Sequence, residues 1–257
     1  MKSTVLIQPE FKEFQQYLDF AGQHQLKFEI VDFAYPDILD ETVLCTERIN
    51  FYLQYKQLIT SMHGVFLDIH PESMDSKIKK VSRERILQNL EIAQKLECRY
   101  IVFHTSFNPL INHPRYIENW MEQQVNCWEQ LISDRDITVV LENVFEYSPR
   151  YLHQLLKKVN LSNLGWCLDS GHINLYSQAS LEEWLQLLGN KLYYVHLNDN
   201  DGKSDQHLPC GHGKINWKQY DSLIRKLNIN PVTVLETSGI EQISKSRRFL
   251  IEQGIIS

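Results

Sequence analysis

The chain has 257 residues, of which 43% are hydrophobic and 23% charged, and its formal net charge at pH 7 is −6. This is the composition of an ordinary globular protein that can bury a sizeable core. The negative charge weighs mildly against a sequence-independent DNA-binding protein, which usually carries a basic surface. No run of about 18 apolar residues occurs, which excludes a membrane-spanning helix.

The first residues and the cysteines both indicate a cytoplasmic protein. Residues 1–7 contain one Lys and a very short apolar run, which predicts a first strand rather than a signal peptide. The five cysteines are scattered, odd in number and never spaced as CxxC. Neither a disulfide framework nor a thiolate zinc site is therefore expected, and the reducing cytoplasm is the expected location.

Short apolar runs alternate with longer amphipathic segments eight times along the chain. The apolar runs predict strands at Ser3–Ile7, Lys27–Val31, Ile59–His63, Tyr100–His104, Thr138–Glu142, Gly165–Asp169, Tyr193–Leu197 and Thr233–Glu236. The amphipathic segments predict helices at Phe11–His24, Glu41–Lys56, Ser76–Leu96, Pro114–Ile132, Pro149–Val159, Leu181–Gly189, Trp217–Leu227 and Ile240–Glu252. Strands that alternate with helices pair in parallel through right-handed crossovers.

Eight such units predict an α/β fold, a (β/α)8 TIM barrel with parallel strands that forms a single domain over residues 1–257. The alternative is an open, doubly wound sheet. Gln8-Pro9-Glu10 follows the first predicted strand, where a dinucleotide-binding fold carries a glycine-rich loop. The barrel is therefore the favoured architecture.

Six consecutive predicted strands end in side chains of the types that bind metal ions. These residues are His63, His104, Glu142, Asp169, His196 and Glu236. The carboxyl ends of the strands form the active-site face of a TIM barrel, so the six side chains are expected to face one another. Carboxylates gathered in one ring repel each other unless a cation lies between them. Because imidazoles and carboxylates are ligands of divalent transition metals, the pattern predicts a metal site.

The segment after strand seven, residues 198–213, is long, polar and glycine-bearing, as functional loops are. Asp205 and His207 stand two residues apart, so both can point to one side of an extended segment. Together with His172, which follows strand six, they are a further candidate ligand set. The alternative is a solvated loop in which the acidic residues only form turns.

At these positions the sequence resembles the xylose isomerase-like TIM-barrel superfamily, which includes endonuclease IV-type abasic-site nucleases and sugar isomerases and epimerases. The resemblance runs from His63 to Glu236, and it departs from the usual Gly-Glu-Gly at His212. The matching stretches are SMHGVFLDIHP, FHTSF, VLENVFE, CLDSGHINLY, VHLNDNDGKSDQHLPCGHG and VLETSG.

The two branches of the superfamily imply different sites. The nuclease pattern implies three zinc ions held by all nine candidates, namely His63, His104, Glu142, Asp169, His172, His196, Asp205, His207 and Glu236. The epimerase pattern implies one ion, often manganese, held by Glu142, Asp169, His196 and Glu236, with His172 contacting the substrate. In that pattern the catalytic residues are Glu142, Glu236 and His172, and the two glutamates exchange protons beside a metal-polarised carbonyl.

We expect a metal-dependent sugar or sugar-phosphate isomerase or epimerase that uses zinc or manganese, between one and three ions, and has a small sugar as its partner. Lys203, Lys214 and Arg115 are the few basic residues near the expected barrel mouth, whereas DNA binding depends on many phosphate contacts. The alternative is a zinc-dependent abasic-site endonuclease whose partner is DNA. A barrel that binds a metal ion and a polyol without turnover is the third class.

Overall fold

The computed structural model describes residues 4–257. Its eight strands close into a barrel in the order β1 to β8, and the pairs β1–β2, β3–β4, β6–β7, β7–β8 and β8–β1 are parallel. The strands are β1 Val5–Ile7, β2 Lys27–Ile30, β3 Ile59–His63, β4 Tyr100–His104, β5 Thr138–Glu142, β6 Leu164–Asp169, β7 Leu192–Leu197 and β8 Val232–Leu235. The predicted TIM barrel is confirmed, and Ser3, the predicted start of the first strand, lies outside the described residues.

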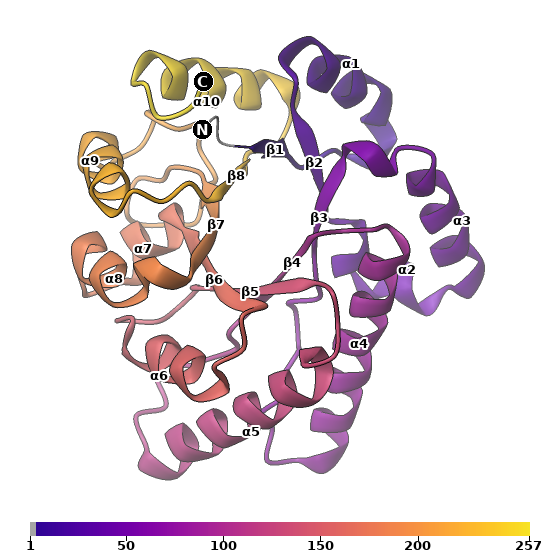
Figure 1. The fold of residues 1–257 in the computed structure, drawn as a ribbon, viewed down its shortest axis with the longest axis vertical. Coiled ribbons are helices and arrows are strands. Elements are labelled where there is room, and N and C mark those ends of the chain that lie inside the picture. Colours follow the sequence, from indigo (N-terminus) through magenta and orange to yellow (C-terminus); the bar gives the residue numbers. More distant parts are fainter. Residues whose placement is uncertain (1–3) are drawn as a thin grey trace. The chain divides into compact units, whose positions relative to one another are not determined.

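Helices follow the strands along the chain (Figure 1). They are α1 Phe14–His24, α2 Pro36–Asp40, α3 Thr42–Leu53, α4 Ser76–Lys95, α5 Pro114–Ile132, α6 Arg150–Val159, α7 Ser170–Tyr176, α8 Leu181–Leu188, α9 Trp217–Leu227 and α10 Ile240–Glu252. Short 3-10 turns lie at Phe11–Glu13, Asp32–Ala34, Lys56–Leu58 and Gly189–Lys191.

Two short helices, α2 and α7, differ from the predicted pattern. Helix α2 has Pro36 at its first position, where proline's fixed φ suits a helix and its missing N–H is not needed. Helix α7 begins directly after β6 because the side chain of Asp169 accepts a hydrogen bond of 2.6 Å from the backbone N–H of His172. The eighth strand also ends one residue earlier than predicted, so Glu236 follows β8.

The chain packs as two compact units. Unit 1 consists of Met1–Glu29, Glu142–Pro149 and Trp166–Ser257, and unit 2 consists of Ile30–Leu141 and Arg150–Gly165. A single domain over the whole chain therefore stays a prediction.

In unit 1, helices α8 and α9 lie beside each other on the outer side of β6 to β8 (Figure 1). Both helices begin where the sequence predicts them. Ser180 and Glu183 form a capping box at the start of α8, and the side chain of Asn216 accepts from the backbone N–H of Gln219 at the start of α9. Trp166 of β6 and Trp184 of α8 are fully buried and stack with ring centroids 5.6 Å apart.

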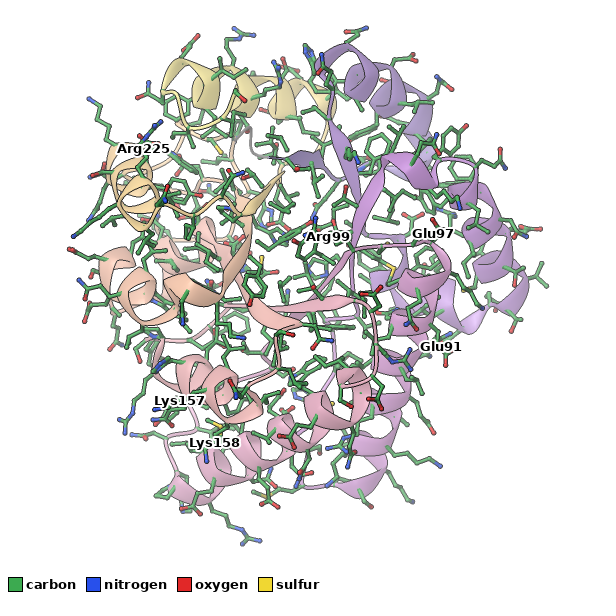
Figure 2. The ribbon with its side chains drawn as sticks, in the orientation of Figure 1. Glu91, Glu97, Arg99, Lys157, Lys158 and Arg225 are labelled. Atoms are coloured by element: carbon green, nitrogen blue, oxygen red, sulfur yellow. The ribbon has the colours of Figure 1, made fainter. Side chains whose placement is uncertain are left out.

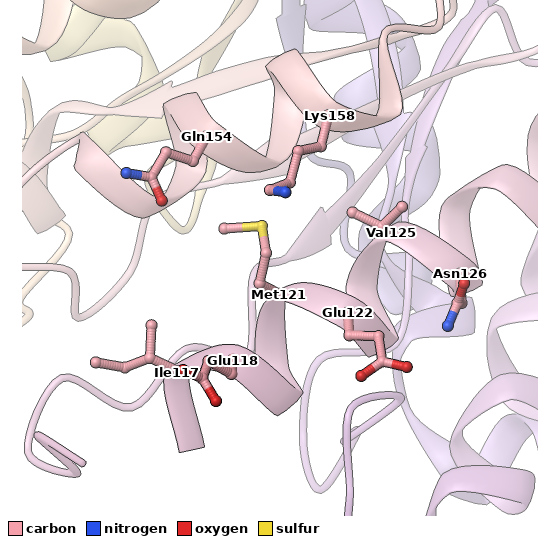
Figure 3. Close-up of a pocket in the computed structure, with 8 residues that line it drawn as sticks. All are labelled: Ile117, Glu118, Met121, Glu122, Val125, Asn126, Gln154 and Lys158. Atoms are coloured by element: carbon pink, nitrogen blue, oxygen red, sulfur yellow. The ribbon is translucent and has the colours of Figure 1, made fainter. Parts of the chain in front are cut away.

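In unit 2, β3 and β4 pair with Met62 opposite Ile101, and Trp120 and Trp128 of α5 are buried. A pocket of about 600 Å³ lies between α5 and α6, where Met121 points toward α6 (Figure 3). It belongs to the helical layer rather than to the strand ends, and its lining residues are Ile117, Glu118, Met121, Glu122, Val125, Asn126, Gln154 and Lys158.

The charged side chains labelled in Figure 2 include Glu91 on α4, Lys157 and Lys158 on α6, and Arg225 on α9, all of which are carried by helices. Across residues 4–257, no helix combines the length and the apolar character needed to cross a lipid bilayer.

Candidate metal centre

Unit 1 gathers four of the predicted ligands from the ends of successive strands. Glu142 is the last residue of β5, Asp169 the last of β6, His196 the second-last of β7, and Glu236 follows β8. Their exposed fractions are 1%, 0%, 0% and 8%. Because β6 and β7 pair Asp169 with His196, the register of the sheet itself brings these side chains to one level.

The imidazole of His196 lies at the centre of this group. Its Nδ1 is 3.2 Å from Oε2 of Glu142 and 3.3 Å from Oε2 of Glu236. Asp169, His196 and Glu236 can each offer one ligand atom within 4.8 Å of the others, and Glu142, Asp169 and His172 form a second set of this kind. We call Glu142, Asp169, His196 and Glu236 the four-ligand cluster.

Burial makes the charges of this cluster costly. Burial, with added repulsion from Glu236 and Glu142, raises the pKa of Asp169 to about 7, although His172 and His196 oppose the shift. Burial alone would lower the pKa of His196, but the acidic groups around it outweigh that effect and raise the pKa well above its usual range. The protons that Asp169 and His196 bind therefore offset the negative charge of the buried carboxylates.

The donor set of the cluster fits a divalent cation. Zinc and manganese accept carboxylates and imidazoles as ligands, and the cluster offers three carboxylates and one imidazole. One divalent cation could take the place of the bound protons and neutralise the negative charge of the carboxylates. Proton release would accompany metal binding, because ligands bind metals in their deprotonated forms.

Asn198, which sequence reasoning did not single out, ties two members of the cluster together. Its side-chain Nδ2 donates to Oδ2 of Asp169 at 2.8 Å and to Oε2 of Glu236 at 3.3 Å. Asn198 is fully buried, and its Oδ1 has no hydrogen-bond partner within residues 4–257. The amide therefore fixes the separation of the two carboxylates.

The structure also brings His172, Asp205 and His207 together, as predicted for the further ligand set. Oδ2 of Asp205 is 3.3 Å from Nε2 of His172, and its Oδ1 is 3.4 Å from Nε2 of His207. Hydrogen bonds from the two imidazoles hold the pKa of Asp205 well below its usual range. Burial would lower the pKa of His207, but the hydrogen bond to Asp205 and nearby carboxylates raise it to about 9. We call these residues the loop cluster.

The loop that carries Asp205 and His207 is ordered by Asp199. The backbones of Asp199 and Leu208 exchange two hydrogen bonds, 2.9 and 2.8 Å long. The buried Asp199 carboxylate accepts from the backbone N–H groups of Gly211 and Ile215 and from Nε1 of Trp217. Asp199 and Asp205 thus do more than form solvated turns, whereas Asp201 accepts from the backbone N–H groups of Lys203 and Ser204 in a turn.

His172 connects the two clusters. Its Nδ1 lies 3.1 Å from Oε1 of Glu142 and 3.0 Å from the carbonyl oxygen of Asn143, while its Nε2 faces Asp205. Burial would lower the pKa of His172, but Asp169, Asp205 and Glu142 raise it well above its usual range. This imidazole is therefore placed to hold a proton between the carboxylates.

In unit 2 the two remaining predicted ligands, His63 and His104, lie next to each other. The rings of His63 and His104 lie 5.3 Å apart, centroid to centroid, at the ends of β3 and β4. Nδ1 of His63 is 2.9 Å from the carbonyl oxygen of Gly64. The ring of Phe66 lies 5.4 Å from that of His63 and 5.0 Å from that of His104.

Sequence reasoning also missed Glu29, the third residue of β2, which is fully buried. Its Oε1 lies 3.2 Å from Nε2 of His196. The available signal was an acidic residue inside an apolar strand, Phe28-Glu29-Ile30, where burial requires polar partners.

The family described as "Xylose isomerase-like TIM barrel" matches residues 20–253. An uncharacterised protein of Methanocaldococcus jannaschii is 28% identical over 201 residues, which cover 74% of this chain and 68% of the relative.

Solved structures share the fold over almost the whole chain. The TTHB071 protein from Thermus thermophilus, soaked with ZnCl2, is 23% identical with a TM-score of 0.77, and 97% of each chain is covered. A D-tagatose 3-epimerase-like protein is 22% identical with a TM-score of 0.77, over 98% of this chain and 96% of the other. Other solved structures with this fold include D-allulose, L-ribulose and 3-keto-D-glucoside epimerases.

Proposed function

Because this chain belongs to the xylose isomerase-like TIM-barrel family, we propose that it is a metal-dependent sugar or sugar-phosphate isomerase or epimerase. The observation that carries the proposal is the convergence of Glu142, Asp169, His196 and Glu236 in one buried cluster. Structures of related fold that are named as sugar epimerases, one of them in complex with D-allulose, support a small sugar as the substrate.

The four-ligand cluster would hold one divalent cation, which supplies polarisation of a substrate carbonyl when it is bound. Zinc and manganese both suit the donor set. A structure of the same fold named as IolI with a bound zinc atom supports zinc as one candidate.

The chain's own carboxylates would move the proton. Glu142 and Glu236 both reach the imidazole of His196, with their Oε2 atoms 3.2 and 3.3 Å from its Nδ1. A pair of carboxylates at opposite sides of a substrate carbon can remove a proton from one face and return it to the other. His172, beside Glu142, would orient a substrate hydroxyl or hold the proton in transit.

One observation favours the alternative, a zinc-dependent abasic-site endonuclease. The loop cluster of His172, Asp205 and His207 supplies three further ligands close enough to share an ion. A second and third zinc would suit phosphodiester hydrolysis, in which several ions stabilise the attacking and leaving oxygens. The four-ligand cluster serves either chemistry, so the number of bound ions distinguishes the two functions.

The test is conversion of free and phosphorylated ketoses by the protein reconstituted with Mn²⁺ or Zn²⁺. Glu142→Gln and Glu236→Gln should each reduce turnover by at least about 100-fold, as expected for loss of an acid–base group, without unfolding the protein. Glu91→Gln on helix α4 is the matched control, because Glu91 is an exposed carboxylate (Figure 2). Near-normal turnover in both site variants would overturn the proposal.

A further inference from the structure

We infer that Glu29 is a positioning residue, which holds His196 in the tautomer and orientation that present its Nδ1 to a metal ion. The inference rests on the proposed metal-dependent function, and it assigns a role to a buried carboxylate outside the four-ligand cluster. It predicts that metal affinity depends on a side chain that does not touch the ion.

The contacts of Glu29 define this role. Its Oε1 lies 3.2 Å from Nε2 of His196, and its Oε2 accepts a hydrogen bond of 2.6 Å from the hydroxyl of Tyr194. Gln8 donates from Nε2 to Oε1 of Glu29 at 2.8 Å. Glu29, Tyr194 and His196 are each 0% exposed, so water does not compete for these contacts.

The two ring nitrogens of His196 face different surroundings. Its Nε2 lies next to the carboxylate of Glu29, whereas its Nδ1 faces Glu142 and Glu236 of the four-ligand cluster. A neutral imidazole carries one N–H, and a carboxylate acceptor draws that proton to the nitrogen beside it. With a cation in the cluster, the carboxylates of Glu142 and Glu236 would bind the ion instead of a proton, so the proton of His196 would lie on Nε2 beside Glu29 and the lone pair of Nδ1 would face the ion.

The backbone supports the same arrangement. Tyr194 and His196 stand two residues apart on β7, so both side chains point to the same face of the strand. Glu29 stands on β2, and it contacts both of them from one carboxylate. Tyr194 thereby fixes the rotation of the carboxylate that in turn fixes the imidazole.

Gln8 extends the network to a second predicted ligand. The amide that donates to Glu29 also donates to Oε1 of Glu236 at 3.2 Å. Gln8 follows β1, which pairs with both β2 and β8, so it reaches the two carboxylates from the strand between them. Glu29 and Gln8 together orient one imidazole and one carboxylate of the four-ligand cluster.

A carboxylate that hydrogen-bonds the outer nitrogen of a ligating histidine fixes the ring and raises its basicity as a ligand. Loss of such a partner typically reduces metal affinity by about 10- to 100-fold. A merely structural ion pair between Glu29 and His196 would instead affect folding stability and leave the metal affinity of the folded protein unchanged.

The experiment is calorimetric titration of Mn²⁺ and Zn²⁺ into the full chain after removal of metal with a chelator. We expect Glu29→Gln to weaken binding by about 10- to 100-fold, and Tyr194→Phe, which keeps the carboxylate but removes one donor to it, to weaken binding less. Glu91→Gln is the control and should bind as the wild type does. Wild-type binding with an unchanged affinity in Glu29→Gln would overturn the inference and leave the proposed function standing. Absence of metal binding in the wild type would overturn both.

A second measurement needs no variant and remains decisive if Glu29→Gln fails to fold. In the zinc-loaded wild type labelled with 15N at histidine, the long-range 1H–15N spectrum reports which nitrogen of His196 carries the proton. We expect a protonated Nε2 and a zinc-bound Nδ1. Zinc bound through Nε2, with the proton on Nδ1, would overturn the inference.

Discussion

A Cβ atom added to Gly171 would lie 2.0 Å from Oδ1 of Asn198. The second residue of α7 is therefore glycine because Asn198 occupies the space where any side chain would begin. Asn198 in turn donates to Asp169 and Glu236, so the absence of a side chain at residue 171 sets the spacing of two predicted metal ligands.

Gly171→Ala should displace Asn198 and separate its amide from the two carboxylates. Insertion of a methyl group into a packed site typically costs about 1–3 kcal/mol of folding free energy. We expect a lower melting temperature and weaker binding of Mn²⁺ or Zn²⁺, measured by thermal unfolding and by calorimetry.

Gly22→Ala is the matched control for this substitution. Gly22 lies in helix α1, and nothing lies within 4 Å of a Cβ built on it. Alanine is favoured over glycine inside a helix by about 0.5–1 kcal/mol, so this variant should be at least as stable as the wild type. A Gly171→Ala protein that matched Gly22→Ala in stability and metal affinity would contradict the role given to Asn198.

Replacing Asp205 and His207 together by alanine tests the number of ions. If the four-ligand cluster alone holds the functional metal, the metal content per chain should be unchanged, and sugar affinity should fall because His172 loses its Asp205 partner. Elemental analysis of protein purified without chelator gives the content. Three ions in the wild type and a loss of one ion in the double variant would instead support the nuclease alternative.

The stability of the metal-free protein should fall as the pH rises from 6 to 9. Folding raises the pKa of Asp169 from 3.8 to about 7, mainly by burial. It raises that of His207 from 6.5 to about 9, because Asp205 and other carboxylates outweigh burial. Between its unfolded and its folded pKa, each group binds more protons in the folded state than in the unfolded state. The stabilisation that these protons provide is therefore lost as the pH rises through the folded pKa of each group. The pKa of Asp205 shifts downward from 3.8, so its effect lies below this pH window.

A metal ion bound to the four-ligand cluster should oppose this trend, because it competes with the protons that Asp169 and His196 bind. We expect the rise in melting temperature on adding Mn²⁺ or Zn²⁺ to be larger at pH 8 than at pH 6. A ligand at about 100 times its Kd stabilises the folded state by about 2.7 kcal/mol, which is readily measured. An equal rise at both pH values would contradict the assignment of Asp169 and His196 to the metal centre.

The sequence predicted the elements that a repeating apolar pattern defines. Helices α5 and α9 begin and end where their periodicity and caps indicate, at Pro114–Ile132 and Trp217–Leu227. The predicted strand ends also indicated that Glu142 and Asp169 lie close together, because parallel strands present their last residues at one edge of the barrel. Helices α2 and α7 were missed since they are too short to show a helical period.

The residues that support the cluster could not be predicted in this way. Glu29 accepts a hydrogen bond from Tyr194, which stands 165 positions away in the sequence, and Asp169 accepts one from Asn198, which stands 29 positions away. Neither pair follows a local spacing rule, since the closed barrel and its register bring them together. A buried polar residue signals that a partner exists, but only the fold identifies which one.

The measurement that tests the central claim most directly is proton exchange at a carbon beside a ketose carbonyl. The metal-loaded protein is incubated with candidate ketoses in heavy water, and deuterium incorporation is followed by NMR or mass spectrometry. We predict incorporation that requires the metal and is lost in Glu236→Gln. Absence of exchange with every ketose, together with efficient incision of abasic duplex DNA that Glu142→Gln abolishes, would contradict the account and establish the nuclease function instead.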